Sequence, residues 1–451
     1  MGHSSQARMG TCLCRIQEMK SIQYMGSKGN LLDFLESCLK DFVGDTPHKV
    51  FHDAFCGSGR VSNHFKDKYR VIASDKQLFS EVIFGAYLCN KKPKEHYEAL
   101  ISHLNNLPPE YLEKTDKWFS KTYGGPYNQG ISVGEDNKPK IWLEKNAQKI
   151  DMIRFRIDEM LAKGEIDQKE KNVLLLSLML AANQRSNVVG HQNGYLKEWA
   201  NIALKDLWLE IPPIEICDKD HKIFIGDIFD IIGNVQSDIA YFDPPYGTSN
   251  KAVSISTVGR YSVFYHLWNT LIENSRPEVW GKANKPIAVK DYTGELEYNI
   301  RERIFPKFVE LFSQTDTKVL MVSYSNQGLL SCEDFVEIFR LSGCDMPTFK
   351  VYCCYHKRNT QESLALKDGE FLNEKEDLME FLFLANKRGV EEPSAKEIEA
   401  WLQKPQNREF PKTYSLFLNG KFFTAEEHKE IELGTYECSV NMSLESLLGW
   451  E

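Results

Sequence analysis

Short apolar runs alternate with amphipathic stretches near the start of the chain. The periodicity predicts a helix over residues 31–42, a strand over 49–52, a helix start at 60–65 and a second strand over 70–74. A glycine-rich turn at 57–59 separates the first strand from its helix. Parallel strands joined by helices form an open α/β sheet, in which ligands bind beyond the carboxyl ends of the strands. We therefore expect a ligand site near this turn.

The alternation stops over residues 88–211, which are mixed polar, aromatic and helical in pattern. They include a Gly/Pro-rich patch at 123–127 and an apolar helical run at 172–182. The pattern indicates one α/β domain that is interrupted by a large insertion. Strand-like runs then resume at residues 222–225, 239–242, 318–323, 348–355 and 381–385.

A separate tail begins near Gly389. Residues 395–402 have a helical pattern, and residues 414–423 have the pattern of a hairpin around Asn419-Gly420. The tail holds twelve acids and six bases, so of the formal net charge of −9 only −3 belongs to the rest of the chain. A nearly neutral body can still carry a local basic cleft for phosphates. We expect the tail to be a small packing or partner-binding appendage.

Composition narrows the class of protein. With 451 residues, 42% of them hydrophobic, the chain is long enough for a large domain with an insertion. It has no apolar run near the ~20 residues that cross a bilayer and no signal-peptide pattern, which predicts a soluble, cytoplasmic protein without a membrane partner. The eleven cysteines are irregularly spaced, and the pair Cys12-x-Cys14 is not followed by a second Cys or His pair at the spacing of a zinc finger. We expect reduced thiols and no metal site.

The most informative segment follows the strand-like run at 239–242 and reads Asp243-Pro244-Pro245-Tyr246. Two prolines fix two φ angles and remove two N–H donors, so the strand must end in a rigid, extended loop. The Asp243 carboxylate and the Pro244 carbonyl can accept both N–H groups of an exocyclic amine, and Tyr246 offers a ring on which a base can stack. Catalysis at such a site rests on positioning and electrostatics.

This tetrapeptide resembles the motif of the site-specific adenine-N6 DNA methyltransferases, the family that includes the bacterial Dam enzyme and many modification partners of restriction endonucleases. Residues 53–59, Asp-Ala-Phe-Cys-Gly-Ser-Gly, are similar to the family's cofactor loop, with alanine in place of the usual proline. The resemblance assigns Asp53, Phe55, Gly57 and Gly59 to S-adenosylmethionine. Asp53 would accept from the methionyl ammonium, and the glycines let the backbone pass close to the cofactor.

The same resemblance assigns further residues to the cofactor. Tyr24 and Lys28 belong to a segment similar to the family's aromatic-x-Gly-Gly/Ser-Lys motif, in which the lysine can meet the cofactor carboxylate and the tyrosine the target or the methionine end. Asp75 closes the second strand, where an acid suits the ribose hydroxyls. Asp227 follows the next strand-like run, beside the expected adenine ring, on which Phe229 can stack.

For the fold, the resemblance implies a doubly wound, mostly parallel seven-stranded methyltransferase sheet. It divides the chain into a cofactor-binding first part over residues 20–87, a target-recognition insertion over 88–211, a catalytic second part over 212–388 and the acidic C-terminal appendage over 389–451. Transfer would be direct and in line, without a metal or a cysteine nucleophile.

An enzyme with such a pocket must rotate adenine out of double-stranded DNA. The loop over residues 247–261 is rich in Ser, Thr and Asn and carries Lys251 and Arg260, a composition that suits phosphate contacts. An ordinary surface loop explains that composition equally well.

The insertion contains a polar stretch over residues 183–197 that could read DNA sequence, because Arg pairs with guanine edges and Asn with adenine edges. Its candidate residues are Arg185, Asn187 and Lys197. A polar helix end followed by a turn explains the stretch nearly as well, and the balanced charge of the insertion favours neither reading.

Two rival functions stay open. An RNA amino-methyltransferase acting on rRNA also has Asp-Pro-Pro-Tyr, although such enzymes are generally compact. A catalytically silent DNA-binding protein could keep the same fold, although the intact Asp243 and Tyr246 speak against it. The resemblance itself implies methylation of adenine N6 at a specific DNA sequence, with a cognate restriction endonuclease as a possible partner.

Overall fold

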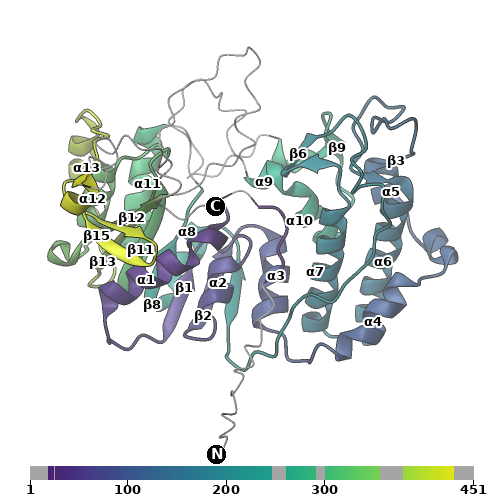
Figure 1. Ribbon diagram of the computed structural model, residues 1–451, viewed down its shortest axis with the longest axis horizontal. Coiled ribbons are helices and arrows are strands. Elements are labelled where there is room, and N and C mark those ends of the chain that lie inside the picture. The colour runs from purple at the N-terminus through teal and green to yellow at the C-terminus, as the bar shows by residue number, and fades with distance from the viewer. Residues whose placement is uncertain (1–18, 25, 246–260, 291–299, 356–378, 431–451) are drawn as a thin grey trace, which may run out of the picture.

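The largest element of the computed structural model is a nine-stranded sheet (Figure 1). The structure describes residues 19–24, 26–245, 261–290, 300–355 and 379–430. Along the sheet, the strand order is β15-β14-β12-β13-β11-β8-β1-β2-β7. In chain order these strands are β1 (Val50–Asp53), β2 (Arg70–Asp75), β7 (Lys222–Ile225), β8 (Gln236–Phe242), β11 (Asp316–Ser325), β12 (Lys350–Tyr355), β13 (Met379–Asn386), β14 (Ser415–Leu418) and β15 (Lys421–Thr424).

The centre of the sheet is parallel. Strands β11, β8, β1, β2 and β7 pair in parallel, and β13 runs antiparallel between β11 and β12. The expectation of a mostly parallel α/β sheet is therefore confirmed. Because β1 and β8 are neighbours in the middle of the sheet, the segments that follow them leave the sheet at the same edge.

The expected strand number of seven is wrong, because the tail adds two strands. Ser415 of β14 pairs in parallel with Tyr352 of β12, and β15 returns from β14 through the predicted turn at Asn419 and Gly420. An edge strand presents unpaired N–H and C=O groups, and the hairpin pairs with those of β12. The hairpin thus extends the sheet by two strands.

Helices cover both faces of the sheet. On one face, Phe34 belongs to a buried cluster with Tyr241 and Leu382. On the other face, Phe335 stacks on Phe383 with ring centroids 4.7 Å apart. The helices of the first face are α1 (Leu32–Val43) and α2 (Arg60–Phe65), and those of the second are α8 (Ile228–Ile231), α11 (Arg301–Gln314) and α12 (Cys332–Leu341).

The residues between β2 and β7 form a mainly helical region beside the β7 end of the sheet (Figure 1). Its helices are α3 (Leu78–Leu88), α4 (His96–Asn105), α5 (Trp118–Tyr123), α6 (Glu144–Ala162) and α7 (Gln168–Gln184), and its short strand pairs are β3 (Gly124–Gly125) with β4 (Trp142–Leu143) and β5 (Val188–Val189) with β6 (His191–Tyr195). Later in the chain come α9 (Tyr261–Phe264), α10 (His266–Glu273), the pair β9 (Val279–Trp280) with β10 (Lys285–Pro286), and α13 (Ala395–Leu402). No helix in the described ranges is long and apolar enough to cross a membrane.

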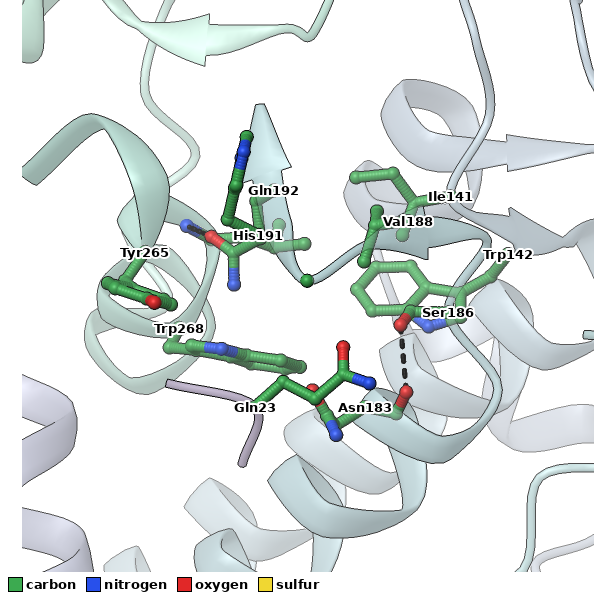
Figure 2. A pocket seen from close by; sticks show the side chains of 12 residues that line it. Gln23, Ile141, Trp142, Asn183, Ser186, Val188, His191, Gln192, Tyr265 and Trp268 are labelled. Carbon is green, nitrogen blue, oxygen red and sulfur yellow. Dashed lines mark hydrogen bonds between the residues drawn. The ribbon is translucent and has the colours of Figure 1, made fainter. Parts of the chain in front are cut away.

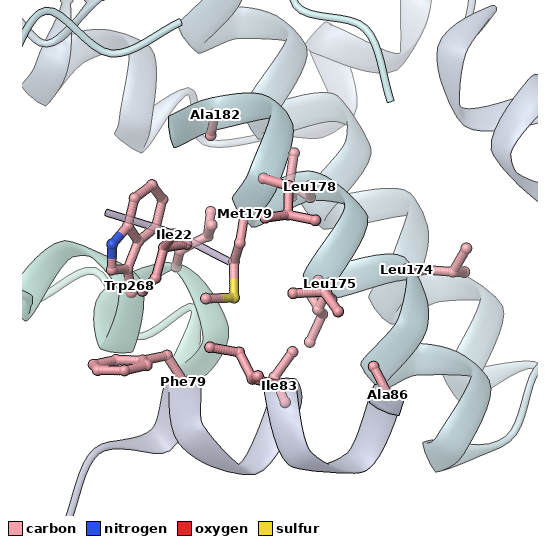
Figure 3. Close-up of a cluster of buried hydrophobic side chains, with 14 of the residues drawn as sticks. Ile22, Phe79, Ile83, Ala86, Leu174, Leu175, Leu178, Met179, Ala182 and Trp268 are labelled. Atoms are coloured by element: carbon pink, nitrogen blue, oxygen red, sulfur yellow. The ribbon is translucent and has the colours of Figure 1, made fainter. Parts of the chain in front are cut away.

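Helix α7 joins the inserted region to the sheet through α3 (Figure 3). Leu175 and Met179 of α7 share a buried cluster with Ile83 of α3. A Cβ on Gly85 would lie 2.1 Å from the Asn172 side-chain nitrogen, so the two helices approach closely only because residue 85 is glycine. The inserted region and the sheet therefore share one continuous core.

The tail is also tied to the body of the protein by a buried carboxylate. Asp334 of α12 pairs with Arg301 at 2.6 Å and accepts hydrogen bonds of 2.9 Å from the Trp401 indole and the Gln406 amide. Because Trp401 lies in α13, this cluster anchors the tail helix to the second face of the sheet.

Candidate active site

Three acids lie at the carboxyl ends of three neighbouring strands. Asp53 is the last residue of β1, Asp75 is the last residue of β2, and Asp243 directly follows β8. Because parallel strands end at one edge, the topology gathers carboxylates that are far apart in the sequence. Burial first, and then the negative charges of Asp243 and Asp75, raise the pKa of Asp53 to about 7. The edge is therefore a place that favours positive charge.

Asp53 is held by the helix that follows it. Its side chain is buried, and one carboxylate oxygen accepts a 2.6 Å hydrogen bond from the Ser62 hydroxyl in α2. This bond favours the ionised form and opposes the rise of the Asp53 pKa. The loop between β1 and α2 is thus closed at its base by a strand-end acid and a helical hydroxyl.

The glycine-rich turn depends on Asp75. Its two carboxylate oxygens accept hydrogen bonds from the backbone amides of Gly57 at 2.7 Å and Gln77 at 2.8 Å. Gly57 and Gly59 have φ angles of +47° and +73°, a region that L side chains rarely adopt. Asp75 was expected to meet ribose hydroxyls. In the structure it organises the turn.

Tyr24 covers this turn. A Cβ on Gly57 would lie 2.9 Å from the Tyr24 hydroxyl oxygen, so the ring lies directly over the glycine. The ring also stacks on Tyr265 with centroids 4.7 Å apart, and Phe79 meets it edge-on. The sequence did not reveal Tyr265, because a tyrosine before a helix start has no distinctive pattern.

Lys28 contacts two acids, the half-buried Asp243 and the buried Glu380. Its Nζ lies 3.0 Å from Asp243 Oδ1 and 3.0 Å from Glu380 Oε1, so its ammonium lies between protein carboxylates. The expectation was that Lys28 meets a cofactor carboxylate. Burial is the main reason that the pKa of Asp243 is raised to about 6, with Lys28 opposing the rise and Glu380 adding to it.

Glu380 was missed in the sequence. It is the second residue of β13, in the run Met-Glu-Phe-Leu-Phe-Leu-Ala-Asn. Apart from this acid, all residues of the run before the final asparagine are apolar and buried. A single acid in a buried apolar strand is the signal that could have found it, since buried carboxylates are rare unless they are paired.

The acid after β7 and its aromatic neighbour lie at the far end of the same edge. Asp227 caps the short helix α8 by accepting from the Phe229 amide at 3.2 Å, and its other oxygen lies 2.9 Å from Lys76. Phe229 is partly buried, with the Lys307 ammonium 5.1 Å from its ring centroid. Phe55 packs against Phe242, with centroids 6.3 Å apart.

The rest of the tetrapeptide is described only in part. Pro244 is buried and Pro245 half-buried, directly after β8. Tyr246, Lys251 and Arg260 lie outside the described residues.

Asn187, which was expected to contact DNA, does not face outward. It is fully buried, and its amide nitrogen donates to the Glu198 carbonyl at 3.0 Å. Its oxygen accepts from the Ala200 amide at 2.9 Å. Because these bonds fix the chain after β6, Asn187 is a structural residue in this conformation.

The other two residues of the polar stretch are more accessible. Arg185 is the C-cap residue of α7, is half-buried and donates from Nε to the Asp206 carbonyl at 2.9 Å. Lys197 follows β6 and is exposed. Of the three expected DNA contacts in the inserted region, Lys197 is thus the most available to a partner.

Tyr265 also lines a small pocket (Figure 2). Gln192 of β6 lies at its wall, accepts from the Leu267 amide at 2.7 Å, and has a buried Nε2 without a hydrogen-bond partner among the described residues. Further lining side chains, shown in Figure 2, come from the segment before Tyr24, the end of α7 and the start of α10, and they include Gln23, Asn183 and Trp268.

The residues at this edge fit S-adenosylmethionine, which carries a sulfonium and an ammonium. Asp53, Asp75 and Asp243 lie at one edge, where the repulsion of Asp53 by the other two carboxylates favours a bound cation. The turn at Gly57 and Gly59 brings backbone close to that edge, as cofactor loops require. Three strand-end acids and a turn with left-handed glycines thus lie next to the Asp-Pro-Pro segment.

Comparisons with known proteins point the same way. Residues 24–298 match the model of a family described as D12 class N6 adenine-specific DNA methyltransferase. The matched range contains the glycine-rich turn, the whole inserted region and the Asp-Pro-Pro-Tyr segment. It does not reach β13, which carries Glu380.

Curated relatives carry similar names. The chain is 29% identical over 363 residues to the modification methylase LlaI of Lactococcus lactis subsp. lactis, with 78% of this chain and 54% of that protein covered. It is 29% identical over 326 residues to the type II methyltransferase M.NlaIII of Neisseria lactamica, covering 71% and 89%. It is 28% identical over 373 residues to M.FokI of Planomicrobium okeanokoites, covering 81% and 55%. The chain thus spans about half the length of LlaI and M.FokI.

Proposed function

This chain belongs to the D12 class N6 adenine-specific DNA methyltransferase family, and we propose that it transfers a methyl group from S-adenosylmethionine to N6 of adenine in double-stranded DNA. One observation carries the proposal. Asp243, followed by two prolines, leaves β8 beside the point where β1 enters the turn at Gly57 and Gly59. Target and cofactor would therefore meet at the edge where an open α/β sheet binds its ligands.

Asp243 and Pro244 would hold the target amine. The amine has two N–H groups, and the Asp243 carboxylate and the Pro244 carbonyl accept one each. Fixing both hydrogens directs the lone pair of N6 away from the two acceptors. S-adenosylmethionine, when bound, supplies an electrophilic methyl group for that lone pair. The contribution of the chain is orientation and electrostatic stabilisation, without a covalent enzyme intermediate.

The cofactor residues divide between the two ends of the edge. We assign the methionine end to Asp53 and the turn at Gly57 and Gly59, with Tyr24 covering them. We assign the adenine end to Asp227 and Phe229. The raised pKa of Asp53 supports this assignment. Burial is its main cause and repulsion by Asp243 and Asp75 adds to it, and a bound ammonium would oppose both by stabilising the carboxylate.

DNA recognition would fall to the region over residues 88–211. The target adenine must leave the helix to reach Asp243, because a base that stays stacked between its neighbours cannot enter the pocket. Lys197 is exposed and suited to a phosphate, and we keep Lys251 and Arg260 as contacts of the loop that follows the tetrapeptide. Arg185 stays a candidate for base contact through the part of its guanidinium that does not hold Asp206.

The test is direct. The protein is incubated with labelled S-adenosylmethionine and, in separate reactions, with unmethylated genomic DNA and with ribosomal RNA. We expect label in DNA, and sequencing that detects N6-methyladenine should place it at one short sequence. Label in RNA alone would replace the proposal by an RNA amino-methyltransferase, and cofactor binding without transfer would indicate a silent protein.

Relatives named type II methyltransferases and modification methylases motivate a further part of the proposal, that the chain acts in a restriction-modification system. DNA methylated by this protein should then resist cleavage by a cognate endonuclease. Digestion of methylated and unmethylated DNA with extract of the source cells measures that protection.

A further inference from the structure

Glu380 reaches the catalytic loop from a strand that is not next to it. Its strand β13 is separated from β8 by β11, yet its carboxylate lies 3.0 Å from the ammonium of Lys28, which in turn lies 3.0 Å from Asp243. The Ser323 hydroxyl of β11, the strand in between, donates a hydrogen bond to Glu380. The three charged groups come from the segment before α1, the end of β8 and the start of β13.

Two of the three side chains are buried, and the cluster carries unequal charge. The exposed fractions of the side chains are 7% for Lys28, 19% for Asp243 and 4% for Glu380. Two carboxylates share one ammonium, so the ionised cluster has a net charge of −1. Stability alone does not explain this arrangement, because a second buried carboxylate adds a desolvation cost and a repulsion that one ammonium does not remove.

We propose that Glu380 is a positioning residue for Asp243. Because Glu380 shares the Lys28 ammonium, the Asp243 carboxylate stays a strong acceptor for the target amine. The inference rests on the proposed function. If Asp243 were its sole carboxylate partner, Lys28 would donate more hydrogen bonds to that acid and attract it more strongly. Because Glu380 binds the same ammonium, Lys28 divides its donors and its attraction between two carboxylates.

The electrostatic surroundings agree with this role. Burial raises the pKa of Asp243, Lys28 lowers it and Glu380 raises it. Among the described residues, the cluster also interacts with Asp53 at the end of β1, the Tyr241 phenol of β8 and the Cys354 thiol of β12. Within the described residues, Lys28 is the cation that acts on all three of Asp243, Tyr241 and Cys354.

The experiment measures the pH dependence of single-turnover methyl transfer to DNA at saturating cofactor. In the parent protein the transfer rate should fall as the pH drops below about 6, the pKa of Asp243. This falling part of the pH–rate profile is its acid limb. Glu380→Gln should move that limb to lower pH, because a like charge is removed, and lower the plateau rate about tenfold, with KM for DNA little changed. Lys28→Gln should move the limb to higher pH.

Two further variants separate positioning from loss of structure. Glu380→Asp keeps the charge and should return the limb toward that of the parent protein. Asp334→Asn removes another buried, ion-paired carboxylate, that of the pair with Arg301, and should lower the melting temperature without moving the limb. An unmoved limb and plateau in Glu380→Gln would overturn the inference.

Each failure has its own signature. If Glu380→Gln does not fold, the Lys28→Gln variant keeps the inference testable. An unmoved acid limb in Lys28→Gln would contradict a charge-sharing cluster. If the parent protein transfers no label to DNA, the proposed function fails. If it transfers label but the variants keep its pH profile, only the role of Glu380 fails.

Discussion

The ring of Tyr24 lies over Gly57, where a Cβ would come within 2.9 Å of the tyrosine hydroxyl. The contact joins the segment before the first helix to the turn after the first strand. It explains why a turn residue with a φ of +47° must also lack a side chain.

Gly57→Ala should weaken S-adenosylmethionine binding at least tenfold. The new methyl group strains a left-handed backbone, at a cost of about 1 kcal/mol, and displaces Tyr24 from the turn. Calorimetric titration of the cofactor measures the effect. Gly44→Ala is the matched control, because Gly44 has a φ of +57° but nothing within 4 Å of its Cβ position. It should cost stability alone, and equal cofactor affinity in both variants would contradict the role of the turn.

Asp243→Ala should abolish methyl transfer and leave the cofactor affinity within about tenfold, because the lost interaction belongs to the reacting amine. The variant should stay folded, since Lys28 keeps Glu380 as a partner. Transfer of labelled methyl groups to DNA and a cofactor titration on the same preparation check both halves. Near-normal turnover would remove Asp243 from the active site.

Asp53→Asn should raise the melting temperature by a few degrees at pH 8 and have no such effect at pH 4. The pKa of Asp53 is about 7 in the folded protein against an ordinary 3.8, so the folded state holds the proton more tightly. Between pH 3.8 and about 7 the free energy of unfolding falls as the pH rises, because the buried carboxyl must lose its proton. The full cost of ionising it is present above pH 7. Replacing the carboxylate by an amide removes that cost. It should also lower the affinity for the cofactor.

Asp238→Asn provides the contrast in the same melting experiment. Burial raises the pKa of Asp238, but hydrogen bonds from Lys318 and from the backbone amides of Lys49 and Val50 outweigh it and lower that pKa to about 2. Its stabilisation is present above about pH 4 and is lost as pH falls toward 2, so its removal should destabilise the protein at neutral pH. Identical pH profiles for the two variants would contradict both assignments.

Lys197→Ala should weaken binding to all DNA sequences and reduce the slope of log affinity against log salt by about 1, as expected for one lost phosphate contact. The melting temperature should stay unchanged, because the side chain is exposed. Binding isotherms at several salt concentrations measure the slope. Asn187→Ala is the counterpart, and should lower stability by about 1–3 kcal/mol by leaving buried backbone groups unpaired. An unchanged salt slope in Lys197→Ala would place the phosphate contacts elsewhere.

The sequence by itself determined the local elements and the chemistry of two loops. The helix over residues 395–402 and the strand over 222–225 were predicted with the bounds that the structure has. Such elements depend on periodicity and turn residues within a few positions, which a single sequence displays. The Asp-Pro-Pro-Tyr run is equally local, since its prolines dictate where β8 must end.

Only the tertiary structure decided what lies opposite these loops. Glu380 joins Lys28 because β13 inserts between β11 and β12, and that pairing depends on the whole sheet order. Asn187 looked like a DNA contact because its type and neighbours are polar, whereas its burial depends on the chain that returns after β6. The two extra strands likewise exist because the edge of β12 was open to a hairpin. A residue's partners far along the chain are set by packing, and local pattern does not contain them.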